Sequence, residues 1–289
     1  YKSEQYLIGI GRAQASGKPA DDQAQADQNA RAEIARQIKT LIQSQLFTQA
    51  EEELNRLGAE EQRRFSQRIK TEVSASESQE LEGMEIAERY YDEKAGIYYA
   101  LAILDRKKNS ALLLSKLNDL DREIAGFMEL KSQNLFNQEP LMALNYLARA
   151  ENSLRKEMGI RSQYLVVSGS SLPSKYHLAD LLKEEEQIKN STKIMVLVFE
   201  SAPGRKPTSI IESYLISSLA GFGFFLVSAP AELRNKGPDN IKDLVISGKL
   251  NLGSNPNYLV LGNFQVKKVS ETKIGSNLYY FYKTGGDIR

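Results

Sequence analysis

The distribution of proline constrains the fold of this chain more than any other feature. After Pro19 no proline occurs until Pro140, and six more follow from Pro173 to Pro256. Proline interrupts helix interiors and central strands. The long proline-free stretch therefore permits long helices and hairpins, whereas the later cluster indicates strands and helices joined by turns. We predict an α+β N-terminal part and an α/β C-terminal part.

Residues 1–106 are predicted to form an α+β domain. The apolar run Tyr6–Ala13 indicates a strand that leads into a loop. Ala20–Glu53 indicates a helix, because its apolar side chains recur every fourth residue. Two strand-like segments, Glu85–Asp92 and Ile97–Leu104, surround turn residues and predict a β hairpin.

Further helices are predicted before and after this hairpin. Phe65–Leu81 fits a helix, which we favour, but also one face of a strand. Residues 107–190 are expected to form an antiparallel helical hairpin and a linker helix. The second helix of the hairpin should start at Pro140 and end near Gly159, and Ser171–Asn190 supplies the linker. The first helix has apolar residues in steps of three and four, as in helices that pack lengthwise: Leu113, Leu117, Leu120, Ile124 and Phe127.

Residues 191–289 are predicted to form an α/β domain with a small mixed sheet. Strand-like segments alternate with helical ones and a hairpin follows; the three strand-like segments are Ile194–Phe199, Phe224–Ser228 and Tyr258–Phe264. Ser209 and Glu212 have the spacing of a capping box at the start of a helix.

The end of this domain is expected to be truncated. Leu278–Lys283 indicates a strand and Thr284–Asp287 a turn, after which only Ile288 and Arg289 remain for a partner strand. We therefore expect the natural chain to continue.

Composition excludes several classes of function. The chain has no cysteine, so disulfides, thiolate metal sites and cysteine nucleophiles are excluded. The net charge of +1 gives no reason to expect binding to nucleic acid or anionic membranes through global charge. No apolar run approaches the roughly 20 residues that span a bilayer. Because Tyr1 rather than Met comes first, we expect a mature or trimmed product without its targeting segment.

The residues that could carry chemistry do not form an active site. Gly9 and Gly11 follow a strand, but Gln14 stands where a dinucleotide motif has its third glycine, so we favour a strand-end turn. His177 is the sole histidine, which excludes zinc sites and histidine triads. The runs Glu51–Glu53 and Glu184–Glu186 are interpreted as solvated helix faces. We predict no catalytic residue, cofactor or metal, and no enzyme.

One loop has the composition of an anion site. Two cations and a glycine precede a predicted helix, whose first amides attract negative charge; the loop residues concerned are Gly204, Arg205, Lys206, Thr208 and Ser209. The alternative, which we favour, is a solvated turn in which Thr208 and Ser209 cap the helix.

The last strand is a candidate interaction edge. It places four aromatic rings among six residues, and an edge strand can accept a neighbouring strand; the candidate edge consists of Leu278, Tyr279, Tyr280, Phe281 and Tyr282. The alternative that we favour is that the continuation of the chain covers this edge. The pairs Tyr90–Tyr91 and Tyr98–Tyr99 should each place one ring on either face of a strand.

The N-terminal part resembles a known family over about residues 1–106. Tyr6–Ala13, Ala30–Ala35, Leu81–Ile86 with Tyr90, and Tyr98–Ala102 occur in the order found in the Lpp-twenty outer-membrane lipoproteins. The same module resembles the N-terminal domain of the flagellar outer-ring assembly protein FlgT.

The C-terminal part is similar to the α/β domain shared by the secretion lipoprotein CsgG, the TolB N-terminal domain and the FlgT middle domain. The segments that carry this likeness are Ile194–Phe199 and Tyr258–Phe264. Two features depart from FlgT: the helical hairpin at 107–190 is larger, and no third domain follows in this chain.

These resemblances imply a non-enzymatic scaffold or assembly protein of the bacterial envelope, in a flagellar outer ring or a secretion-type complex. They imply a periplasmic place, with outer-membrane attachment only through a lipid anchor outside this chain. The implied partners are other envelope proteins or further copies that form a ring or oligomer, and not nucleic acid. The alternatives are a regulator of a cell-wall synthase, like the LpoB activators, and a small-anion-binding module that uses Ser201–Ser209.

Overall fold

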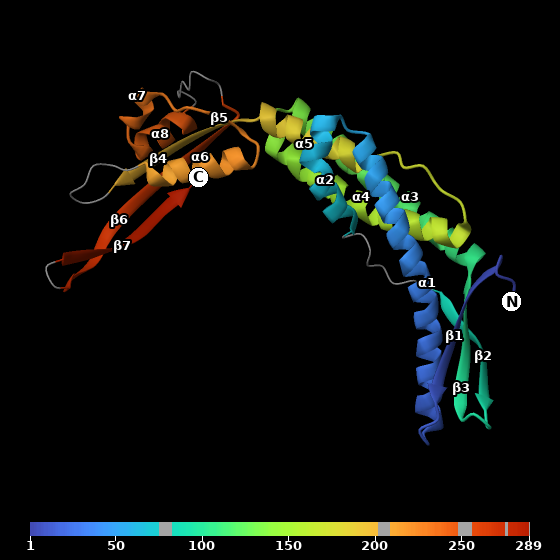
Figure 1. Ribbon diagram of the computed structural model, residues 1–289. Coiled ribbons are helices and arrows are strands. Elements are labelled where there is room, and N and C mark those ends of the chain that lie inside the picture. The colour runs from blue at the N-terminus through green and yellow to red at the C-terminus, as the bar shows by residue number, and fades with distance from the viewer. Residues whose placement is uncertain (75–82, 202–208, 248–255, 275–276, 289) are drawn as a thin grey trace. The chain divides into compact units, whose positions relative to one another are not determined.

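The computed structural model describes residues 1–74, 83–201, 209–247, 256–274 and 277–288, with side chains up to residue 265. The chain divides into two compact units, Tyr1–Lys183 and Glu184–Arg289. Both units combine helices with a small sheet (Figure 1), so the predicted mixed fold class is confirmed.

The first unit begins with a sheet-and-helix module and continues with helices. Its elements are β1 (Tyr6–Gln14), α1 (Pro19–Asn55), α2 (Ala59–Ser74), β2 (Met84–Asp92), β3 (Ile97–Asp105), α3 (Arg106–Phe136), α4 (Pro140–Ser168) and the start of α5 (Leu178–Ser191). The strands form an antiparallel sheet in the order β1-β3-β2. The predicted strand, long helix and β hairpin are confirmed.

The helix α1 contributes to two cores. Its N-terminal half packs on one face of the sheet through Ala26, Ala30 and Ile34, and its C-terminal half lies against α2 and α4. The helix favoured from Phe65 onward is confirmed as far as Ser74, and the remainder to residue 81 lies outside the described residues.

The helices α3 and α4 form the predicted antiparallel hairpin. Leu117 and Ile124 of α3 are buried, as are Leu147 and Leu154 of α4. The N-terminus of α3 is capped by the Asp105 side chain, which accepts a hydrogen bond from the Lys108 amide at 2.9 Å.

The predicted end of α4 near Gly159 is wrong. Gly159 is a buried interior residue between Met158 and Ile160, which are also buried. Burial of these neighbours offsets the roughly 1 kcal/mol that an interior glycine costs relative to alanine. The helix ends at Gly169, whose φ of 74° gives the left-handed conformation of a helix C-terminus. The linker helix α5 begins at Leu178, later than predicted.

The second unit contains the predicted mixed sheet. After the end of α5 its elements are β4 (Lys193–Ser201), α6 (Ile210–Gly221), β5 (Phe225–Val227), α7 (Ala231–Arg234), α8 (Pro238–Ile246), β6 (Tyr258–Ile274) and β7 (Asn277–Ile288). The strand order is β5-β4-β6-β7, with β4 parallel to β5 and β6, and β7 antiparallel to β6. The helix α6 covers one face, and α7 with α8 covers the other.

Two local predictions in this unit are wrong. Thr284–Asp287 is not a turn, because these residues continue β7 and pair with β6, Gly285 opposite Gln265. Ser209 precedes α6 but makes no side-chain cap, and Glu212 does not reach back to it. Instead, Glu212 accepts a hydrogen bond from the Val198 amide at 3.1 Å and pairs with Arg234. The three-residue β5 pairs with β4 only at Lys193–Met195, so Glu212 satisfies an amide of β4 beyond that pairing.

Candidate functional site

The two faces of the N-terminal sheet have different environments. One face lies under α1 and carries small residues at its centre, where Gly9 is opposite Ala102 and Gly11 is opposite Ala100. The other face points away from α1, and no helix of the described residues lies over it (Figure 1).

Gly9 and Gly11 allow α1 to approach the backbone of β1 closely. A Cβ atom on Gly9 would lie 2.3 Å from the carbonyl oxygen of Ala30, and one on Gly11 would lie 2.1 Å from that of Ala26. Both glycines lie inside β1, so the favoured strand-end turn is wrong. This Gly-x-Gly serves the close packing of a helix on a strand.

An ion pair connects the sheet to α1. Arg89 of β2 donates to both carboxylate oxygens of Asp27, at 2.8 Å from Nη2 and 3.1 Å from Nε. The hydrogen bond from Arg89 holds the pKa of the Asp27 carboxyl below its usual value, although burial acts in the opposite direction. Near the start of α1, the Ser16 hydroxyl and amide donate to Asp22 and lower the pKa of its carboxyl in the same way.

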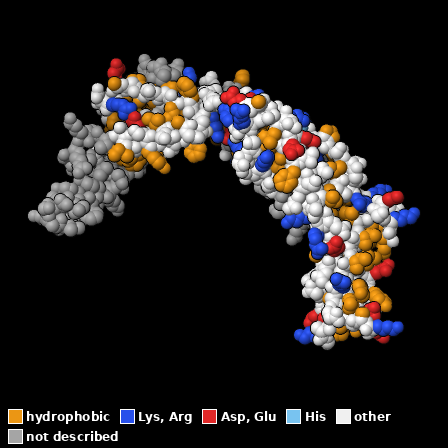
Figure 2. Space-filling view, viewed as in Figure 1, with side chains coloured by type: hydrophobic (Ala, Val, Ile, Leu, Met, Phe, Trp, Pro, Cys, Tyr) orange, Lys and Arg blue, Asp and Glu red, His pale blue; other side chains and the backbone are white. Residues whose placement is uncertain are grey.

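The open face of the sheet is apolar, and we define it by the outward residues of its three strands. These are Tyr6, Ile8, Ile10, Arg12 and Gln14 on β1, Ile97, Tyr99, Leu101, Ile103 and Asp105 on β3, and Glu85, Glu88, Tyr90 and Asp92 on β2. Ile10 is 66% exposed and Tyr90 is 65% exposed. Figure 2 shows hydrophobic side chains at the surface over these strands. Antiparallel sheets commonly present a polar outer face to water, so an apolar one indicates a binding surface.

The tyrosines follow the predicted alternation. Tyr90 lies beside Tyr99 on the open face with ring centroids 6.2 Å apart, whereas Tyr91 stacks on Tyr98 on the α1 side at 4.3 Å. The sequence therefore contained a signal for the open face in these tyrosines and in the alternation of Ile8 and Ile10 with the two glycines. It did not show which side α1 covers.

A hollow of about 200 Å³ adjoins one end of the open face. It lies between the sheet and the first turns of α3 and is lined by Tyr6, Glu85, Ile103, Lys108 and Leu112, among others. The open face therefore ends in a depression that an apolar side chain of a partner could enter.

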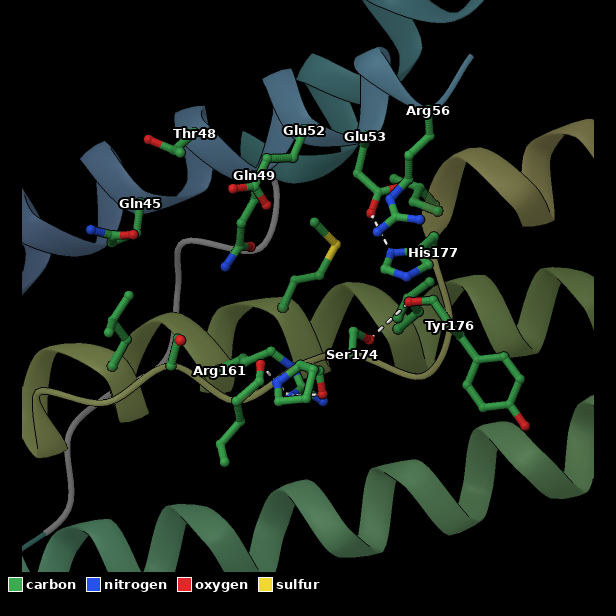
Figure 3. A pocket seen from close by; sticks show the side chains of 17 residues that line it. Gln45, Thr48, Gln49, Glu52, Glu53, Arg56, Arg161, Ser174, Tyr176 and His177 are labelled. Atoms are coloured by element: carbon green, nitrogen blue, oxygen red, sulfur yellow. Dashed lines mark hydrogen bonds and ion pairs between the residues drawn. The ribbon is translucent and has the colours of Figure 1, made fainter.

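A second cavity, of about 410 Å³, lies between α1, α4 and the segment before α5 (Figure 3). Its main polar groups hold that segment in place. Arg161 Nη1 donates to the carbonyls of Leu172 and Pro173, at 2.9 and 2.7 Å. Glu53 accepts from the Ala179 amide at 2.8 Å and contacts Nδ1 of His177 at 3.1 Å. Glu53 is buried, so its interpretation as part of a solvated helix face is wrong.

Glu157 lies beneath this segment and is fully buried. Burial raises the pKa of its carboxyl, and the hydrogen bond from Arg161 opposes the shift. Ser174 of the segment also donates to Glu157, at 3.2 Å. The polar side chains of this cavity therefore hold the segment between α4 and α5 in place through hydrogen bonds.

The anion-loop hypothesis falls mostly outside the described residues. Gly204, Arg205, Lys206 and Thr208 belong to the range 202–208, and Ser209 lies at the N-terminus of α6. The first amides of α6 already have an acceptor, because Glu200 of β4 accepts from Ile211 at 2.9 Å. A carboxylate of the chain therefore occupies the position that the hypothesis reserved for a ligand.

For the candidate interaction edge, the structure describes the path of the backbone but not the side chains. Leu278, Tyr279, Tyr280, Phe281 and Tyr282 lie in β7, which is an edge strand among the described strands and pairs with β6 on one side. Their side chains lie outside the described residues.

The described residues offer neither a metal cluster nor a membrane span. Within them, no group of three or more histidine and acidic side chains could hold a metal ion. The described helices include none that is long and apolar enough to cross a bilayer.

Comparison with known proteins finds a family match over the domain that carries the open face. Residues 1–105 match the model of the LPP20 lipoprotein family. This LPP20-like domain comprises β1 to β3 with α1 and α2. A similar solved structure is that of the secreted protein HP1454 from Helicobacter pylori, with 17% identity and a TM-score of 0.33 over 96% of this chain and 81% of that one. A search of curated proteins gave no match.

Proposed function

We propose that this protein is a non-enzymatic assembly protein of the bacterial cell envelope, and that its LPP20-like domain binds other proteins through the open face. One observation carries the proposal: the domain that matches a lipoprotein family presents an apolar sheet face with Ile10 and Tyr90 about two-thirds exposed. The family match supports association with the envelope.

The finer proposal is a periplasmic protein of a flagellar outer ring or a secretion-type complex. It rests on the sequence resemblance alone. The cavity beside Glu53 supports no enzymatic alternative, since Arg161 and Glu53 bind the chain's own backbone there.

Site-specific photo-crosslinking in cells tests the proposal. A photoreactive residue at Ile10 or Tyr90 should crosslink to an envelope protein that mass spectrometry then identifies. The same residue at Gln28, which is exposed on α1 of the same domain, is the matched control and should give no such product. Absence of any protein crosslink from both face positions, or recovery of the protein outside the envelope fraction, contradicts the proposal.

A further inference from the structure

We propose that a second copy of this chain occupies the open face, so that two LPP20-like domains stack sheet against sheet about a twofold axis. The inference rests on the proposed function, because it uses the same face, and it goes further by naming the occupant. Isologous dimers need a surface that is complementary to itself. The charges of the open face meet that requirement.

The two outer strands of the open face carry opposite charges. On β1 the outward charged residue is Arg12, and on β2 the outward charged residues include Glu85 and Glu88. The one arginine of β2, Arg89, points to the other face, where it pairs with Asp27. The central strand β3 contributes Tyr99, Leu101 and Ile103 to the middle of the face. The face is thus apolar at its centre, cationic at one edge and anionic at the other.

These charges select one of two twofold arrangements. With the axis parallel to the strands, β1 of each copy lies over β2 of the other. Arg12 then lies at the level of Tyr90 of the other copy, since both residues pair with Tyr99, and Glu88 is the next outward residue along that strand. With the axis across the strands, β2 lies over β2 and carboxylates face carboxylates. The first arrangement pairs opposite charges twice and is favoured.

The size of the face predicts a weak dimer. Each strand has nine residues, so three strands about 4.8 Å apart with a rise of about 3.4 Å per residue give roughly 400 Å² per copy. Standard interfaces bury about 800 Å² per partner. We therefore expect association at micromolar concentration or above.

Sedimentation equilibrium of the full chain, from low to several hundred micromolar, tests the inference. Arg12→Glu and Glu88→Arg should each weaken self-association about tenfold or more, because each places like charges together twice. An equimolar mixture of the two variants should associate again, as should the double variant, since both restore opposite charges. This restoration also shows that the variants fold. Lys39→Glu, an exposed charge reversal on α1, is the control and should change nothing.

Three outcomes overturn the inference. If the chain stays monomeric over the whole concentration range, no second copy binds the open face. Association that is unchanged by Arg12→Glu and weakened by Tyr280→Lys places the contact on β7 instead. Binding of the monomer to phosphatidylglycerol vesicles that Ile10→Asp abolishes identifies a lipid surface. If the purified chain is monomeric while Ile10 crosslinks to a different envelope protein in cells, the proposed function stands and this inference alone fails.

Discussion

Gly9 and Gly11 determine how closely a helix can lie on a strand. Each position has a backbone carbonyl of α1 closer than 2.5 Å to where a Cβ atom would be. Sequence alone showed two glycines after an apolar run, a pattern shared by turns and nucleotide loops. What distinguishes close packing is the small residue on the facing helix, Ala26 or Ala30, and this pairing is known only once the fold is known.

Gly11→Ala should destabilise the protein by about 2 kcal/mol or more, because the new methyl group forces α1 away from β1. Urea unfolding measures the effect. Gly126→Ala is the matched control: it lies in α3 with open space around it, so the substitution should be neutral or stabilise by up to about 1 kcal/mol. Equal effects at the two positions would show that close packing is not the reason for Gly11.

The ion pair of Asp27 and Arg89 should make stability depend on acid pH. The pKa of Asp27 is lower in the folded state than in the unfolded chain, so its contribution is present above the unfolded value of about 3.9 and is lost as the pH falls through the folded value. Arg89→Gln should lower the free energy of unfolding near neutral pH, because it removes both hydrogen bonds to Asp27, and the loss should be small since Arg89 is half exposed. The difference from the unmodified protein should shrink below about pH 4.

Urea unfolding between neutral pH and pH 3 measures this difference. Arg122→Gln is the control, because Arg122 and Asp119 form an exposed pair whose side chains are 78% and 66% accessible. If the loss of unfolding free energy in Arg89→Gln does not change with pH, ionisation of the Asp27 carboxyl does not cause it.

At the scale of elements, hydrophobic periodicity predicted the long helices correctly. Predictions that relied on a single local signal, such as one glycine or one capping pattern, were wrong. The four-residue spacing of α1 and the mixed spacing of α3 gave correct helices because their buried stripes are long. The sequence predicts a helix end near Gly159, but α4 continues through this residue because its neighbours Met158 and Ile160 are buried. The Ser209–Glu212 pattern failed because Glu212 is drawn to Arg234 and to an amide of β4, partners that are distant in sequence.

The stability of the hairpin of α3 and α4 depends on the buried apolar residues between the two helices, which we call the seam. Leu117→Asp should destabilise the protein by several kcal/mol, because an unpaired charge would enter a fully buried site. Leu114→Asp lies one turn away on α3, where the side chain is 39% exposed, and should cost less than about 1 kcal/mol. Thermal unfolding followed by circular dichroism compares the two. Similar losses from both substitutions would contradict this assignment of the seam.

At the scale of the whole molecule, we predict from the sequence that limited proteolysis separates three units, with cuts near Gly169–Ser174 and Asn190–Lys193, where Ser, Gly and Pro cluster between patterned segments. The structure adds a reason for resistance at the first place, since Arg161 binds the carbonyls of Leu172 and Pro173. Arg161→Met combined with Glu157→Gln should increase cleavage there by a protease of broad specificity. Glu157→Gln alone removes the charge of that carboxylate but leaves Arg161 to donate to Leu172 and Pro173, so it should not increase cleavage.

Mass spectrometry of the fragments locates each cut. Unchanged cleavage at 169–174 in the double variant would mean that Arg161 does not protect this segment.

The candidate site was harder to predict from the sequence than these domain boundaries. The residues of the open face were visible as strand residues, but their exposure depends on α1 covering the opposite face, which is a property of the assembled unit.

The helix α1 connects the sheet of the first unit mechanically to its helical part. It is one continuous helix of 37 residues, about 55 Å long. Near its start it is fixed to the sheet by Ala26, Ala30 and Asp27, and near its end Gln49 donates to Ser162 of α4 and Glu53 accepts from Ala179. The match to the lipoprotein family stops at residue 105, so it includes all of α1 and none of α4. A fragment cut at that boundary keeps the contacts of α1 with the sheet and α2 but loses its attachments to Ser162 and Ala179. If a partner binds the open face as proposed, α1 would transmit a force on that partner from the sheet to α4, because one unbroken helix contacts both.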